Sequence, residues 1–258
     1  MRVSCYCCTY GRPPRVLAEA VESFLRQDFQ GEAELVILND LAGQKLTLDP
    51  ARVPAGRAVR VINCDDRCPS LGYKFRMAVG LCRGEILLPW EDDDIFLPWR
   101  ISWSLANLRD GYYHTNRAWY EHGGPGILVP TTNLFHCNMA FTKALYAQVG
   151  GYDRDDTAAL DQSLFCRLTA AGAKGMDTPW SDVHYIYRWQ HSGSWHGSGM
   201  DGAPPTEEAA RRVATDIARG SVPMGEVEIK PAWLRDWTAL AAKAAKLKQQ
   251  EESTHGSA

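Results

Sequence analysis

The stretch "LLPWEDDDIFLPWR", Leu87 to Arg100, places four consecutive acidic residues between two apolar runs. The first apolar run is typical of a buried strand, and the acids follow directly where that strand ends. Adjacent carboxylates repel one another, which favours proton uptake or a bound cation. The pattern therefore indicates a divalent cation at a strand end. A solvated loop and an anionic N-terminal cap of the following helix are the alternatives.

The sequence around this stretch alternates short apolar runs with helical patterns, as repeated βαβ units with a mostly parallel sheet do. The predicted strands are 3–10, 33–40, 58–64 and 84–90, and the predicted helices are 12–29 and 72–83. Polar clusters follow three of these strands: Thr9 to Arg12, Asn39 with Asp40, and Glu91 to Asp94. Ligands of open α/β sheets bind beyond the carboxyl ends of strands, so we expect these clusters to line one crevice.

The second half of the chain is rich in aromatic residues, glycine and histidine, for example in "GYYHTNRAWYEHGGPG" and "VHYIYRWQHSGSWHGSG". Aromatic loops on a rigid scaffold suit the recognition of a polar, flat-faced ligand such as a sugar. The alternative for any single aromatic residue is burial in the core.

From Glu207 the sequence predicts two helical segments separated by "GSVPMGEVEIKP". The last segment has an apolar stripe of Trp233, Trp237, Leu240 and Ala241, which we expect to pack onto the domain. Homodimer formation or weak membrane contact through this stripe are the alternatives.

The composition excludes several classes of protein. The chain has 258 residues, 45% of them hydrophobic, and a formal charge of −3, which gives no general footprint for polyanions. No apolar run reaches the roughly 18 residues of a membrane span, and no signal peptide pattern is present. We therefore expect a cytoplasmic protein whose eight cysteines are reduced. Cys64 and Cys68 are spaced for zinc, but no second ligand pair accompanies them.

Four segments together resemble glycosyltransferase family 2, whose enzymes have the GT-A fold. They are "CTYGRPPRVLAEAVESFLRQ", "LVILND", "LGYKFRMAVGLCRGEILLPWEDDDIFLP" and "VGGYDRDDTAALDQSLFCRL", in the family's order and spacing. The resemblance covers roughly Val3 to His196. It implies an α/β fold with a Rossmann-like, mostly parallel central sheet flanked by helices.

The resemblance also implies a division of the chain. Residues 1–205 are expected to form the GT-A domain, with a nucleotide-binding half at 1–110 and an acceptor-binding half at 111–205. A C-terminal helical extension would span 206–250, and 251–258 would be a disordered tail.

The activity implied is that of a metal-dependent, inverting glycosyltransferase that uses a nucleotide-sugar donor, usually a UDP-sugar, with Mn²⁺ or Mg²⁺. The positions that match the family's donor-binding residues are Thr9, Tyr10 and Arg12 in the first loop, Asp40 for the base, Lys74 near the nucleotide, and Asp92 and Asp93. Asp92 to Asp94 cover the family's Asp-x-Asp motif (DXD motif), although Glu91 replaces a common Asp. Asp93 is the first choice as metal ligand, joined by Asp94 and by His191, with His196 as the alternative histidine.

Asp161 falls at the family's general-base position, on a helix after the "GGYD" loop. A base there would remove the proton of the acceptor hydroxyl. Asp156 is the other candidate for the base. The alternative interpretation of Asp161 is a purely structural carboxylate at a helix N-terminus, which is common.

The acceptor is open to several interpretations. Processive relatives carry Gln-x-x-Arg-Trp and membrane helices, whereas this chain has Tyr185 in place of the glutamine before Arg188 and Trp189. A non-processive transfer to a glycan, lipid or small molecule is therefore expected. Transfer to a modified base in DNA and a catalytically inert carbohydrate-binding protein remain alternatives. A sugar-nucleotide pyrophosphorylase is disfavoured because "CTYGRPPR" lacks its glycine-rich signature.

Overall fold

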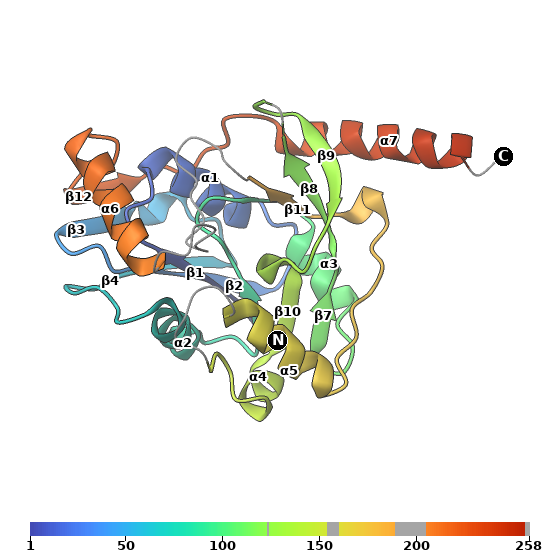
Figure 1. Cartoon of the computed structure of the whole chain (residues 1–258), viewed down its shortest axis with the longest axis horizontal. Coiled ribbons are helices and arrows are strands. Elements are labelled where there is room, and N and C mark those ends of the chain that lie inside the picture. The colour runs from blue at the N-terminus through green and yellow to red at the C-terminus, as the bar shows by residue number, and fades with distance from the viewer. Residues whose placement is uncertain (123, 154–159, 189–204, 256–258) are drawn as a thin grey trace.

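Six strands form the central sheet, in the order β4-β2-β1-β5-β10-β7 (Figure 1). The computed structural model describes residues 1–122, 124–153, 160–188 and 205–255. The strands of the central sheet are β1 (Arg2–Thr9), β2 (Glu32–Asn39), β4 (Arg57–Asn63), β5 (Ile86–Pro89), β7 (Tyr112–His114) and β10 (Met139–Thr142). β1, β2, β4 and β5 are parallel, whereas β10 runs antiparallel to its neighbours β5 and β7. The prediction of an α/β fold with a mostly parallel sheet is confirmed.

Both faces of the sheet are covered by helices, which explains why its central strands read as continuous apolar runs. In β1, Cys5 and Cys7 face the core that contains α1 (Pro14–Leu25), while Tyr6 faces the core that contains α2 (Leu71–Leu81). Cys5 and Cys7 are almost fully buried, so they act as small hydrophobic residues of the core.

The remaining helices extend these two layers. α3 (Arg100–Ala106) contributes Ile101 to the core that contains α1. α4 (Lys143–Gln148) and α5 (Leu160–Ala170) contribute Leu145 and Leu164 to the core that contains α2. The short 3₁₀ turns are η1 (Pro50–Arg52), η2 (His136–Asn138) and η3 (Trp180–Asp182).

A second sheet has the order β6-β11-β8-β9. Its strands are β6 (Ile95–Phe96), β8 (Arg117–Glu121), β9 (Leu128–Thr132) and β11 (Tyr185–Tyr187). α7 (Trp237–His255) packs against the core of this sheet through Trp237, Ala241 and Ala245, and its far end projects from the body (Figure 1). The helix continues to His255, so the first part of the tail expected to be disordered is helical.

The C-terminal region contains a strand that the sequence analysis did not predict. β12 (Gly225–Ile229) lies between α6 (Pro205–Ala218) and α7 and pairs in parallel with β3 (Gln44–Leu48). Val213 on α6 packs with Leu41 and Val222, which holds the helix over the loop that follows β2. Among the described helices, none combines the length and the apolar character that crossing a membrane requires.

Candidate active site

A cavity of about 400 Å³ lies beyond the carboxyl ends of β1 and β5. Its walls come from the loop after β1, α2, the acidic run, η2, the start of α5 and β11. Seven of the residues predicted for the site line it: Tyr10, Arg12, Lys74, Asp92, Asp93, Asp94 and Asp161. Segments separated by more than a hundred positions therefore meet in one polar cavity.

The acidic run occupies the tight connection between β5 and β6. The Trp90 N–H donates to the carbonyl oxygen of Tyr6 at 2.8 Å, which ends β5 against β1. The Arg188 guanidinium donates to the carbonyl oxygen of Asp93 at 2.5 Å and fixes the turn from the other side. The four carboxylates have three different sets of partners. Glu91 contacts His136, Asp92 and Asp93 contact Arg12, and Asp94 contacts Tyr185.

Arg12 holds the middle of the run. Its Nε donates to Asp92 Oδ1 at 2.9 Å, and its Nη2 lies 2.7 Å from the same oxygen and 3.1 Å from Asp93 Oδ2. Burial alone would lower the pKa of Arg12, but the charges of Asp92 and Asp93 outweigh burial and raise it. The guanidinium of Arg12 thus already supplies a positive charge to Asp92 and Asp93, which offsets the repulsion between their carboxylates.

Asp94 is turned inward and is 1% exposed. Tyr185 Oη donates to Asp94 Oδ2 at 2.5 Å, and the Arg188 backbone N–H donates to Oδ1 at 2.8 Å. Burial, and secondly the charge of Asp93, raise the pKa of Asp94 well above its usual value. Asp94 therefore ties the acidic run to β11 while still forming part of the cavity wall.

Lys74 lies on α2 and reaches the base of the cavity. Its Nζ donates to the carbonyl oxygen of Thr9 at 2.6 Å and to Asp40 Oδ1 at 2.5 Å. The other oxygen of Asp40 accepts a hydrogen bond from the Cys68 N–H at 2.9 Å. Thr9 and Asp40 are buried behind Lys74 rather than in the cavity wall, so in this structure they position the lysine.

The loop after β1 depends on Gly11, whose φ of +63° is unfavourable for residues with a Cβ. A Cβ at Gly11 would lie 2.5 Å from Cγ1 of Val213, so α6 packs directly on this loop. Tyr10 follows the end of β1 and carries the Arg67 guanidinium 4.3 Å above its ring. α6 therefore contacts the loop that supplies Tyr10 and Arg12 to the cavity wall.

Asp161 stands in the first turn of α5 and lines the cavity. Its Oδ1 accepts a hydrogen bond from the Gln162 N–H at 2.9 Å, and the side chain is partly exposed. The competing acid Asp156 and the candidate metal ligands His191 and His196 lie outside the described residues.

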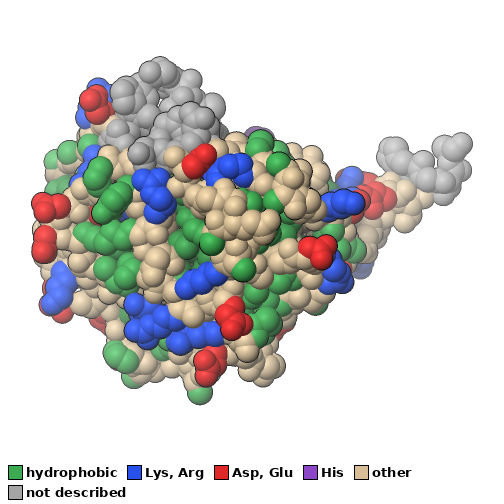
Figure 2. Space-filling view, turned by 90° about the horizontal axis from the view of Figure 1, so that it is seen from below, with side chains coloured by type: hydrophobic (Ala, Val, Ile, Leu, Met, Phe, Trp, Pro, Cys, Tyr) green, Lys and Arg blue, Asp and Glu red, His purple; other side chains and the backbone are tan. Residues whose placement is uncertain are grey.

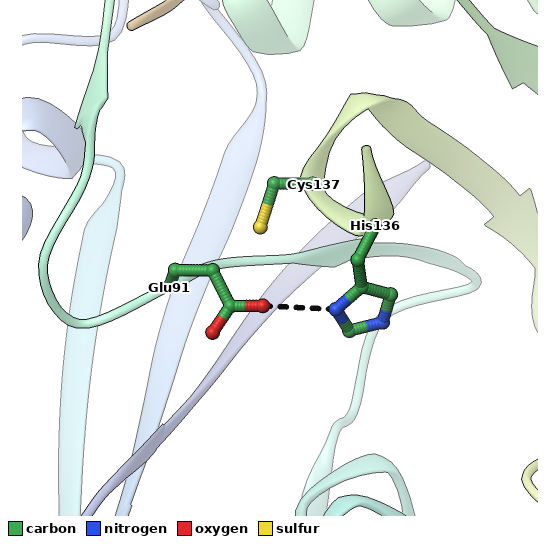
Figure 3. Close-up of side chains that lie close together, drawn as sticks. All are labelled: Glu91, His136 and Cys137. Carbon is green, nitrogen blue, oxygen red and sulfur yellow. Dashed lines mark hydrogen bonds and ion pairs between the residues drawn. The ribbon is translucent and has the colours of Figure 1, made fainter. Parts of the chain in front are cut away.

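A hydrogen-bonded chain that the sequence analysis missed leads from the cavity into the core. His136 Nδ1 lies 2.9 Å from Glu91 Oε1, and His136 Nε2 lies 2.6 Å from Tyr152 Oη (Figure 3 draws the first contact). Tyr152 Oη in turn lies 2.5 Å from Tyr6 Oη. The only sequence signal was a histidine and a cysteine in "LFHCN", just before a buried strand.

Within the described ranges, one group of three side chains has its ligand atoms placed for a metal ion. Glu91, His136 and Cys137 offer oxygen, nitrogen and sulfur atoms that all lie within 4.8 Å of one another. Cys64 and Cys68 belong to no such group in the described part of the chain, and all eight cysteines are free.

Transfer to a base in DNA would require exposed basic residues for the phosphates, and two basic residues near the acidic run are buried instead. Arg100 is fully buried and donates to the carbonyl oxygens of Pro89 and Cys137 at 2.6 and 2.5 Å, and Lys74 is 4% exposed. Figure 2, which views the molecule of Figure 1 from below, shows several Lys and Arg side chains close together on this face, with Asp and Glu side chains beside them. Arg100 is therefore not available to bind phosphates, and Lys74 is engaged with Thr9 and Asp40 inside the cavity.

Comparison with solved structures finds the same fold in other proteins, one of them a mannosyltransferase. No protein-family model and no curated protein matches the chain. S. aureus TarS 1-349 in complex with UDP-GlcNAc matches with a TM-score of 0.60 and 16% identity, over 84% of this chain and 66% of that chain. The mannosyltransferase PcManGT from Pyrobaculum calidifontis, in complex with GDP-Man and Mn²⁺, matches with a TM-score of 0.55 and 16% identity, over 96% of this chain and 80% of that chain. The chain spans 40% of the longer TarS structure.

Proposed function

We propose that this chain is a GT-A glycosyltransferase, similar to family 2, that transfers a sugar from a nucleotide-sugar to an acceptor hydroxyl with inversion. The observation that carries the proposal is the single cavity lined by Arg12, Lys74, Asp93 and Asp161. Structures of the same fold hold UDP-GlcNAc in TarS and GDP-Man with Mn²⁺ in PcManGT, which supports a nucleotide-sugar donor. We propose a UDP-sugar first and a GDP-sugar second.

Arg12 is suited to bind the donor diphosphate, because a guanidinium donates two parallel hydrogen bonds to phosphate oxygens as it does to carboxylate oxygens. Its present partners are Asp92 and Asp93. A diphosphate would compete with these carboxylates for the guanidinium, which would free Asp93 for another cation. Tyr10, under Arg67, is placed to contact the nucleoside part.

Asp93 fits a divalent cation because its carboxylate lines the cavity and already faces a positive charge. Mg²⁺ and Mn²⁺ prefer carboxylate oxygens and share their coordination with substrate phosphates. Both oxygens of Asp94 accept hydrogen bonds, so Asp93 ranks before Asp94 as the ligand. When bound, the cation would stabilise the charge that develops on the leaving diphosphate.

Asp161 is the proposed general base. It is partly exposed and lines the same cavity as Asp93. Its carboxylate keeps lone pairs available beyond its bonds to the Gln162 backbone N–H and, at 3.4 Å, to the Gln162 side-chain amide. A carboxylate here would accept the proton of the acceptor hydroxyl as that oxygen attacks the anomeric carbon. Attack opposite the departing diphosphate gives inversion.

We assign the donor half to 1–110, the acceptor half to 111–205 and the C-terminal extension to 206–250. The contact between Gly11 and Val213 supports a role of the extension in shaping the donor loop. A glycan, lipid or small molecule is favoured over DNA as the acceptor, because Arg100 and Lys74 are buried.

The proposal is tested by thermal unfolding of the protein with UDP, GDP, dTDP and CMP, each with and without Mn²⁺. A ligand at about 100 times its Kd adds about 2.7 kcal/mol to the stability of the folded state. We expect one nucleotide to raise the Tm only with Mn²⁺, and Asp93→Ala to abolish the shift. Asp177→Ala, which alters a carboxylate that is 76% exposed and distant in sequence from the acidic run, is the control. If no nucleotide shifts the Tm at millimolar concentration, the proposed function is wrong.

A further inference from the structure

Glu91, His136 and Cys137 differ from the proposed Asp93 site in their chemistry. The three residues offer one oxygen, one nitrogen and one sulfur ligand from the acidic run and from η2 (Figure 3). Imidazole and thiolate together favour Zn²⁺ and Co²⁺, whereas Mg²⁺ and Mn²⁺ prefer oxygen ligands. All three residues line the cavity, which leaves a fourth coordination position open to it. Three protein ligands with one position left for water or substrate are typical of catalytic zinc sites, whereas structural zinc sites have four protein ligands.

We propose that Glu91, His136 and Cys137 form a binding site for a thiophilic divalent cation, Zn²⁺ or Co²⁺, in the cavity wall. The site is separate from the carboxylates that Arg12 holds, and the inference does not depend on sugar transfer.

The surroundings of His136 support the role of a metal ligand. Ligating histidines usually donate their second ring N–H to a fixed partner, which orients the ring. His136 Nε2 lies 2.6 Å from Tyr152 Oη, and Tyr152 is itself held 2.5 Å from Tyr6 Oη. With the proton on Nε2, the Nδ1 lone pair points toward Glu91.

The surroundings of Cys137 show what binding requires. Burial raises the pKa of the Cys137 thiol, and the charge of Glu91 adds to this effect, but a hydrogen bond from the Glu91 backbone lowers it. The same backbone bond would stabilise the thiolate once a cation is present. Binding must therefore release the thiol proton of Cys137, so the affinity falls as the pH is lowered.

The pair formed by Glu91 and His136 needs only a small adjustment to bind one ion. Glu91 Oε1 and His136 Nδ1 are 2.9 Å apart as a hydrogen bond. Two ligands of a tetrahedral ion, each about 2.0–2.2 Å from the metal, lie roughly half an ångström farther apart than this. Glu91 is 30% exposed at its side chain, so it has room to move.

The test is titration of the full-length protein with Co²⁺ in the absence of nucleotide. We expect one ion to bind per chain with visible bands of four-coordinate Co²⁺ and a near-ultraviolet band from sulfur to cobalt. Cys137→Ser should abolish the sulfur band, and Zn²⁺ should displace Co²⁺. Tyr152→Phe should weaken binding by about 10- to 100-fold while keeping the sulfur band. Cys166→Ser, at an exposed cysteine, is the matched control and should bind as the unaltered chain does.

Three results would overturn the proposal: no sulfur band, a sulfur band that survives Cys137→Ser, or a band that Asp93→Ala removes. X-ray absorption at the zinc edge of the unaltered protein gives a second measurement, should Cys137→Ser not fold. One sulfur in the first coordination shell supports the site, and a shell of oxygen and nitrogen alone excludes it. Failure here leaves the Mn²⁺-dependent nucleotide shift untouched, so the two proposals fail separately.

Discussion

Arg188 and Glu19 form an ion pair in the interior, with 2.7 Å between Nη1 and Oε2 and side chains that are 0% and 1% exposed. Arg188 also binds the backbone of Asp93, and the other Glu19 oxygen accepts the Trp237 indole N–H at 3.0 Å. The pair therefore joins β11, the acidic turn, α1 and the start of α7. These contacts hold the acidic turn against α1 and α7.

Removing one partner leaves a buried charge without compensation, which costs about 3–5 kcal/mol. We expect Arg188→Met to lower the free energy of unfolding in urea by this amount and to weaken donor binding through loss of the bond to Asp93. Glu19→Gln keeps an oxygen for Trp237 but removes the charge.

The double variant Glu19→Gln with Arg188→Met should be less destabilised than the sum of the single variants, because no unpaired charge remains. Additive losses in this double-mutant cycle would show that the pair contributes no coupling energy.

The central strands β1, β2 and β5 could be predicted because a strand that is buried on both faces of a sheet consists of a continuous apolar run. β3 and β12 were missed because both are short and each depends on a partner far away in the sequence. The pattern of β12 was present, since Val227 and Ile229 alternate with glutamates, but a strand inside a helical region has no local signal for its partner.

That Arg12 and Asp93 line one cavity could be predicted, since both follow strands at the edge where a parallel sheet binds ligands. Asp161 follows no predicted strand, and only the family resemblance indicated its role. The hydrogen-bond and ion-pair partners within and around the site could not be predicted. Arg188 meets Glu19 across 169 positions, and His136 meets Glu91 only because η2 packs beside the acidic turn. Such contacts depend on tertiary packing rather than on local pattern.

Asp161→Asn tests the proposed base. The amide keeps the size of the carboxylate but cannot take a proton, so we expect transfer to fall by about 10²–10⁴-fold with unchanged donor affinity. Release of the nucleotide from its sugar in the presence of acceptor measures the rate, and the Tm shift with Mn²⁺ measures binding. Asp153→Asn, at an acid bound to Arg167 and 45% exposed, is the control. If both variants lose the same share of the transfer rate, Asp161 is not the general base.

Gly11→Ala tests the contact between the donor loop and α6. The change adds about 1–2 kcal/mol of strain at φ +63°, and the clash with Val213 adds about 1–3 kcal/mol. Gly220→Ala is the matched control, because Gly220 has a φ of +73° and open space around its Cβ position. We expect weaker nucleotide binding for Gly11→Ala alone.

Val213→Ala in the Gly11→Ala background should restore part of the stability and of the binding, because the smaller side chain makes room for the new Cβ. Stability is read from urea unfolding and affinity from nucleotide titration. If Gly11→Ala behaves as Gly220→Ala does, α6 does not support the donor loop.

His114 makes stability depend on acid pH. Burial lowers the pKa of His114 to about 4 from 6.5, and its Nε2 has no hydrogen-bond partner among the described residues. The unfolded chain therefore binds a proton below pH 6.5 that the folded chain does not bind until about pH 4. The unfolded state is favoured as the pH falls through this window, by about 3 kcal/mol in total.

His114→Gln removes the titrating group while keeping a polar side chain. We expect the unaltered protein to lose more stability than the variant between pH 6.5 and 4, in urea unfolding at a series of pH values. Above pH 6.5 the difference between the two proteins should be constant, because His114 is then neutral in both states. His184, which burial also holds neutral, is present in both proteins and cancels in the comparison. A difference that stays constant down to pH 4 would mean that His114 takes up its proton in the folded protein as readily as in the unfolded chain.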